Sequence, residues 1–151
     1  MFIVIVAIVF ACRHAIAAMI CRRKLASVLA ELDWAYDRFR KDSSTKDLNE
    51  AGLAFLAETN RLLNRVVLVM YPDSNGANLT GEHWLAFLDA CDNSTVFSQG
   101  DGKVLGDGMY RPTFDADPDA LYQVAKQWIE HRYTEKTGNS GTLAPSGSVI
   151  A

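Results

Sequence analysis

The sequence predicts a mainly α-helical protein, in which an N-terminal transmembrane helix and a helical stalk precede a small helical domain with an irregular glycine-rich loop. Three observations support this fold class. Residues 1–12 and 15–21 are almost entirely apolar. Apolar side chains recur every three or four residues through 22–40 and again through 46–71, the spacing of one face of a helix. Helix-start signals then occur near Thr80 and at Asp117.

The first apolar segment predicts a transmembrane anchor over residues 1–21. Arg22, Arg23 and Lys24 follow it directly, and no Lys or Arg precedes it, so these three residues are the candidate topology determinants. Because basic flanks remain on the cytoplasmic side, we expect the N-terminus outside and the body in the cytoplasm. A cleaved signal peptide is the alternative, since residues 15–17 resemble a cleavage site, but the positive leader of such peptides is absent.

The length of the anchor allows two arrangements. A spanning helix needs roughly 20 apolar residues, and Arg13 interrupts the run after about half that number. Either the helix continues to Cys21 with Arg13 extending its side chain toward the interface, or the membrane exit lies near Arg13 and the natural chain begins further upstream. We prefer the second arrangement, which makes the anchor truncated.

The rest of the chain predicts a stalk and linker over 22–44, a helical domain over 45–134 and a disordered tail over 135–151, where small polar residues predominate. The helix over 46–71 should end at Pro72. Thr80 is expected to cap the next helix, and the helix that begins at Asp117 should end near Thr134. Residues 96–98 and 104–105 are expected to form very short strands or loop segments that touch the core.

Charge is distributed unevenly along the chain and argues against nucleic acid as a partner. Residues 1–46 carry eight Lys and Arg against four Asp and Glu, whereas residues 47–151 carry seven against fourteen. An acidic body repels phosphate backbones, whose neutralisation supplies most of the affinity for nucleic acids.

No motif assigns catalytic, cofactor-binding or metal-binding residues. The glycine-rich segment 97–112 lacks the Ser or Thr of a phosphate loop, because Val104 follows Lys103. The spacing of His83, Cys91 and His131 leaves a zinc site open, although core or capping roles fit these residues better. Large aromatic and aliphatic side chains are instead expected to form the structural core, with these candidates: Trp84, Phe87, Leu88, Tyr110 and Trp128.

Several sequence blocks resemble a family of small bacterial membrane proteins, the domain of unknown function numbered 4381. The most specific block is residues 79–89, Leu-Thr-Gly-Glu-His-Trp-Leu-Ala-Phe-Leu-Asp. Weaker blocks are residues 62–67 with Tyr71-Pro72, residues 97–100, residues 110–112 and residues 128–131. The resemblance covers about residues 1–133. At its front the chain departs from the family pattern, in which a short periplasmic segment rich in Pro and Trp precedes a full span.

This resemblance implies a single-pass protein of the bacterial inner membrane with a periplasmic N-terminus and a cytoplasmic helical domain. Family members occur in gene neighbourhoods with MoxR-type AAA+ ATPases and von Willebrand A proteins, in clusters linked to stress tolerance. The implied partners are therefore the lipid bilayer and those two protein classes, and the implied role is that of a non-enzymatic adaptor or scaffold. The alternative is a small ligand-binding or hydrolytic domain that uses loop 97–112 with His83 or Tyr110.

Overall fold

The computed structural model describes residues 2–45 and 47–138, and every regular element in these two ranges is a helix. The elements, in chain order, are α1 (Phe2–Ser43), α2 (Leu48–Met70), η1 (Gly76–Asn78), α3 (Gly81–Asp92), η2 (Asp101–Lys103), α4 (Val104–Asp107), η3 (Gly108–Tyr110) and α5 (Pro118–Gly138). The prediction of a mainly α-helical fold is confirmed. The segments 96–98 and 104–105, for which short strands were one expectation, form turns and part of α4.

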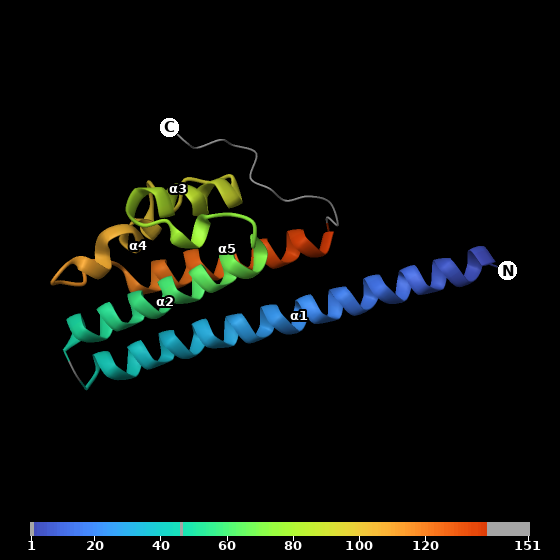
Figure 1. Cartoon of the computed structure of the whole chain (residues 1–151). Coiled ribbons are helices and arrows are strands. Elements are labelled where there is room, and N and C mark those ends of the chain that lie inside the picture. The colour runs from blue at the N-terminus through green and yellow to red at the C-terminus, as the bar shows by residue number, and fades with distance from the viewer. Residues whose placement is uncertain (1, 46, 139–151) are drawn as a thin grey trace.

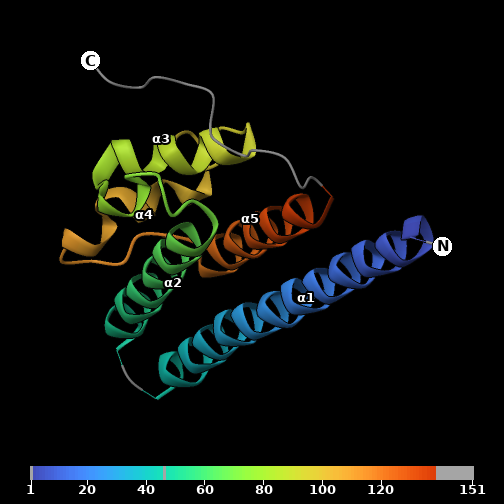
Figure 2. The same cartoon turned by 45° about the vertical axis from the view of Figure 1, so that its right-hand side comes forward.

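The body consists of two layers. Helices α2 and α5 both run antiparallel to the second half of α1, and α3 and α4 cover the side of α2 and α5 that faces away from α1 (Figure 1). The turned view shows the same arrangement, with the first half of α1 projecting beyond the body (Figure 2). The C-terminal ends of α2 and α5 therefore lie toward the projecting half of α1.

The stalk expected over residues 22–44 is not a separate segment, which corrects that prediction. Helix α1 continues through it without a break, and Val28, Leu32, Ala35 and Phe39 are buried in the core. Their spacing of three and four places them on one face of the helix, which packs against α2 and α5. The periodic apolar face that predicted a helix is thus one wall of the domain.

Side-chain contacts between aromatic residues join α1 to α5 at the end remote from the N-terminus. The rings of Tyr36 and Tyr122 stack with their centroids 4.5 Å apart. The Tyr36 hydroxyl donates to Asp119, and the Tyr122 hydroxyl donates to Asp33 Oδ1 at 2.5 Å. These hydrogen bonds raise the pKa of both phenols, because phenolate would lie beside a carboxylate.

Side-chain capping marks the starts of α2 and α5 but not that of α3. Asp47 caps α2 by accepting a hydrogen bond from the Asn49 backbone N–H, so the helix begins at Leu48. Thr80 occupies the cap position of α3, but its side chain makes no capping hydrogen bond. Asp117 Oδ1 accepts from the backbone N–H groups of Asp119 and Ala120 at the start of α5.

Helix α5 extends further than expected, to Gly138 rather than to about Thr134. Residues 135–138, which the sequence assigned to a disordered tail, are therefore helical, and residues 139–151 of that tail lie outside the described residues. One contact that extends the helix is the salt bridge from Arg132 to Glu135, with 2.9 Å between Nη1 and Oε2. Pairs at this spacing stabilise the turn between them.

Candidate functional site

The glycine-rich segment is filled by side chains of the protein itself. Phe97 is 1% exposed and meets Trp128 edge to face, with ring centroids 6.3 Å apart. A Cβ atom on Gly102 would lie 2.6 Å from the Phe97 ring, and one on Gly106 would lie 2.9 Å from Leu85. These glycines allow the segment to approach the core closely, so their presence has a packing explanation.

A buried carboxylate fixes the start of this segment. Asp89, which is 6% exposed, accepts hydrogen bonds at 2.8 Å from the backbone N–H of Phe97 through Oδ1 and from that of Ser98 through Oδ2. The carboxylate thereby satisfies two backbone donors that no helix or strand pairs. The sequence indicated Asp89 only as the last residue of the block 79–89, without a role.

Most of the predicted core residues lie in the interior. Trp84, Leu88 and Trp128 are buried, and Phe87 is half-buried with its ring stacked on Trp84. The Trp84 indole N–H donates to Asn60 Oδ1 at 2.9 Å, and the Trp128 indole N–H donates to the Leu88 carbonyl at 3.0 Å. Both buried indoles therefore have the hydrogen-bond partner that such groups require.

Tyr110 was expected in the core, and this prediction is wrong. It is 78% exposed and is the last residue of η3, after which Arg111 is extended. The position of Tyr110 between glycines and prolines gave no helical or strand periodicity from which its direction could be judged.

Arg132 is the most deeply buried cation of the body, at 3% exposure. Its guanidinium donates to Asp92 Oδ1 at 2.6 Å, to the Cys91 carbonyl and to the Tyr71 hydroxyl at 3.3 Å. Burial lowers the pKa of Arg132, but the hydrogen bond that its guanidinium donates to Tyr71 and the attraction of Tyr71, Glu135 and Asp92 outweigh it, so the net direction is upward. The cluster joins α2, α3 and α5, and the charge of Arg132 is paired with Asp92 and Glu135 in this contact.

The histidines and cysteines of the body do not assemble into a site. His83 is exposed, and His131 Nδ1 lies 3.1 Å from Asp92 Oδ1 at the edge of the Arg132 cluster. Burial raises the pKa of the Cys91 thiol to about 11, so the thiol is protonated at neutral pH. Within the described residues, no three His, Cys, Asp or Glu side chains lie in a group that could hold a metal ion.

The first half of α1 makes almost no contact with the body. Its large apolar side chains, at least half exposed, are Ile3, Val4, Ile5, Val6, Ile8, Val9, Phe10, Ile16, Met19 and Ile20. The most apolar 18-residue window of this helix has a mean hydropathy of 2.4, and 0% of it is buried. By length and composition this one helix could span a membrane, and a signal sequence near the N-terminus would have the same properties.

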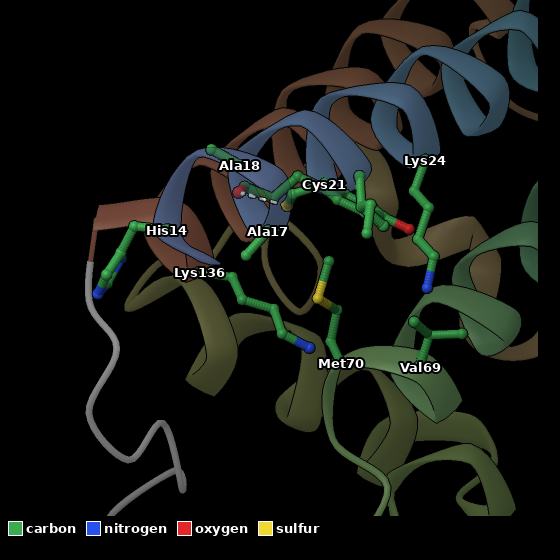
Figure 3. Close-up of a pocket in the computed structure, with 10 residues that line it drawn as sticks. His14, Ala17, Ala18, Cys21, Lys24, Val69, Met70 and Lys136 are labelled. Atoms are coloured by element: carbon green, nitrogen blue, oxygen red, sulfur yellow. Dashed lines mark hydrogen bonds between the residues drawn. The ribbon is translucent and has the colours of Figure 1, made fainter. Parts of the chain in front are cut away.

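A groove lies where this exposed half of α1 meets the body (Figure 3). Its volume is about 320 Å³, and its lining residues are His14, Ala17, Ala18, Ile20, Cys21, Lys24, Val69, Met70, Tyr133 and Lys136. The Cys21 thiol donates to the Tyr133 carbonyl at 3.5 Å and so holds α1 against α5 beside the groove. Of the three predicted topology determinants, Lys24 lines the groove, whereas Arg22 and Arg23 are exposed outside it.

A family model described as "Domain of unknown function (DUF4381)" matches residues 1–131. The chain belongs to this family. The match includes the exposed half of α1, the whole of α2 to α4 and most of α5, whereas Tyr133 and Lys136, the α5 residues that line the groove, lie beyond it. No curated protein and no solved structure matches the chain.

Proposed function

We propose that this DUF4381 protein is a membrane-tethered, non-enzymatic adaptor of the bacterial inner membrane. The observation that carries the proposal is the continuity of α1, whose exposed apolar half leads without interruption into the half that forms a wall of the core. A flexible linker would let the body move freely, whereas a shared helix fixes its height and orientation relative to the bilayer.

In the proposed topology the N-terminus is periplasmic and the body is cytoplasmic. Arg22, Arg23 and Lys24 support this orientation, because a basic cluster next to a span tends to stay in the cytoplasm. The membrane exit is placed near Cys21, since Ile16 and Ile20 keep about half of their surface exposed and the body begins to contact α1 there. Arg13 then lies about 12 Å from the exit along the helix and reaches toward the interface through its long side chain.

The proposed partners of the body are a MoxR-type AAA+ ATPase and a von Willebrand A protein. Support comes from the family resemblance and from the surface that the body offers. Residues 47–151 carry a net charge of minus seven, and Trp34 is 59% exposed on the α1 face of the body. Exposed Trp residues are frequent anchors of protein interfaces, and a charged surface steers oppositely charged partners toward them.

The proposal is tested by affinity capture of the full chain from membranes solubilised in mild detergent. We expect recovery of a MoxR-type ATPase or a von Willebrand A protein, and reduced recovery with Trp34→Ala. Leu48→Ala is the matched control, because Leu48 is also 59% exposed but lies at the start of α2. Recovery of neither partner class would remove the adaptor role.

A separate extraction experiment tests the anchor. The protein should stay with the membrane in high salt and at alkaline pH and leave it only in detergent, because an apolar span is held by the hydrocarbon core. Release by salt alone would replace the span with a surface-bound helix held by Arg22, Arg23 and Lys24.

A further inference from the structure

We propose that the groove between α1 and the ends of α2 and α5 binds one anionic phospholipid of the cytoplasmic leaflet. This inference rests on the proposed function, because it requires the exposed half of α1 to lie in the bilayer. With the anchor alone, this surface would contact any lipid of the bilayer without preference. The groove adds selective binding of one anionic phospholipid.

The groove has the two parts that a phospholipid needs. Ala17, Ala18 and Val69 are among its apolar lining residues, next to the segment that is proposed to span the membrane. Lys24 on α1 and Lys136 on α5 reach into it from opposite sides, with the side chain of Met70 between them (Figure 3). An acyl chain can thus lie along the helix while the phosphate meets two ammonium groups.

The size and depth of the groove favour a lipid over a small ion. Its volume of about 320 Å³ equals that of about ten water molecules at ~30 Å³ each, far more than one phosphate needs. Between His14 and Lys24 the lining follows α1 for about 15 Å, at ~1.5 Å per residue. That length reaches from the headgroup region into the hydrocarbon core.

The charges around the groove favour an anion. In the part of the chain that the structure describes, neither Lys24 nor Lys136 takes part in a salt bridge, whereas the neighbouring Glu135 is paired with Arg132. The C-terminal ends of α2 and α5 contribute partial negative charge there. This amounts to about half a charge per helix, so the two lysines outweigh it.

The end of the body that faces the groove is also apolar. Leu68 and Val69, in the last turn of α2, are 58% and 44% exposed. In the proposed orientation these two adjacent apolar side chains touch the membrane surface beside the lipid. The groove is therefore continuous with the proposed membrane-facing surface and opens toward a source of phospholipid.

The test uses the full chain reconstituted in phosphatidylcholine vesicles with or without a minor share of phosphatidylglycerol. Native mass spectrometry after gentle release counts the lipids that stay bound. We expect one retained phosphatidylglycerol per chain, in preference to phosphatidylcholine. Each lysine near the surface is worth a factor of about five in affinity, so Lys24→Gln or Lys136→Gln should lower this preference about fivefold and the double variant about thirtyfold.

Two matched controls separate a built site from general surface charge. Arg22→Gln with Arg23→Gln removes the same charge at the same depth but outside the groove, and should leave the preference near that of the wild type. Ala18→Leu should fill the apolar part and reduce retention of the lipid, whereas Ala15→Leu, one turn away and outside the lining, should not.

Four results would overturn the inference. Equal loss in the arginine and lysine double variants would mean bulk electrostatic attraction without a site. Full competition by soluble glycerol phosphate would mean that the acyl chain contributes nothing. Retention of a second copy of the chain or of a peptide, with no lipid, would mean a protein occupant. A protein that resists salt and alkaline extraction yet shows no lipid preference would refute the lipid site while leaving the membrane anchor intact.

Discussion

Replacement of Leu32 by alanine tests whether the second half of α1 belongs to the core. Leu32 is 0% exposed and lies in the contact of α1 with α2 and α5. Removing a fully buried leucine side chain typically costs about 3 kcal/mol, within a range of ~2–5, through lost transfer energy and the cavity left behind. Helix propensity cannot explain a loss of this size, because alanine is the better helix former.

The assay is urea unfolding of the full chain in mild detergent, followed by the fluorescence of Trp84 and Trp128, which unfolding exposes. Leu48→Ala is the control, since Leu48 is 59% exposed and its loss should cost less than about 0.5 kcal/mol. If Leu32→Ala were as mild as Leu48→Ala, residues 22–44 would be a solvent-exposed stalk, and α1 would not form a wall of the core.

Three further predictions concern the body. Asp89→Asn should destabilise the body by about 1–3 kcal/mol in the same unfolding assay, because an amide group would face one of the two buried backbone donors that the carboxylate now satisfies. The exposed substitution Asp101→Asn is the control. Equal unfolding midpoints of the two variants would contradict the role of Asp89. Gly52→Ala should also lower the unfolding midpoint, since its new Cβ would lie 2.3 Å from the Phe114 ring; a higher midpoint would show that the ring moves aside. At pH 8, Cys91 should alkylate about a hundredfold more slowly in the native than in the denatured protein, because burial raises its pKa from 9.0 to about 11 and the thiolate is the reactive form. The native rate should rise steeply up to about pH 11, and equal native and denatured rates at pH 8 would contradict the buried environment.

The sequence was informative wherever one element carried its own signal. The apolar run, the spacing through residues 46–71 and the Asp117-Pro118 pair predicted α1, α2 and the start of α5, because periodicity and capping are local properties. The same periodicity in residues 22–40 predicted a helix but not its surroundings. An apolar face shows that something covers it, and the spacing does not say whether that is a partner or the remainder of the same chain.

The groove could not be predicted because it combines distant segments. Cys21 and Tyr133, which join α1 to α5 beside it, are 112 positions apart. Lys24 was recognised as a topology determinant from the sequence. Its position opposite Lys136 depends on the length of α5, which was predicted to end near Thr134 and in fact extends to Gly138. The partly buried pair of Arg132 and Asp92 was missed for the same reason, since its members are 40 positions apart and each also suits an exposed helix surface.

The most direct test of the anchored arrangement is the location of the two ends of α1 in intact cells. Single cysteines at Ile3 and Ser43, in a chain whose own cysteines are replaced by serine, are treated with a membrane-impermeant maleimide before and after permeabilisation of the inner membrane. The anchored arrangement predicts that the Ile3→Cys variant reacts in cells with only the outer membrane opened, and that Ser43→Cys reacts only after the inner membrane is opened. Equal access of both positions before that step, or the reverse order, would contradict it.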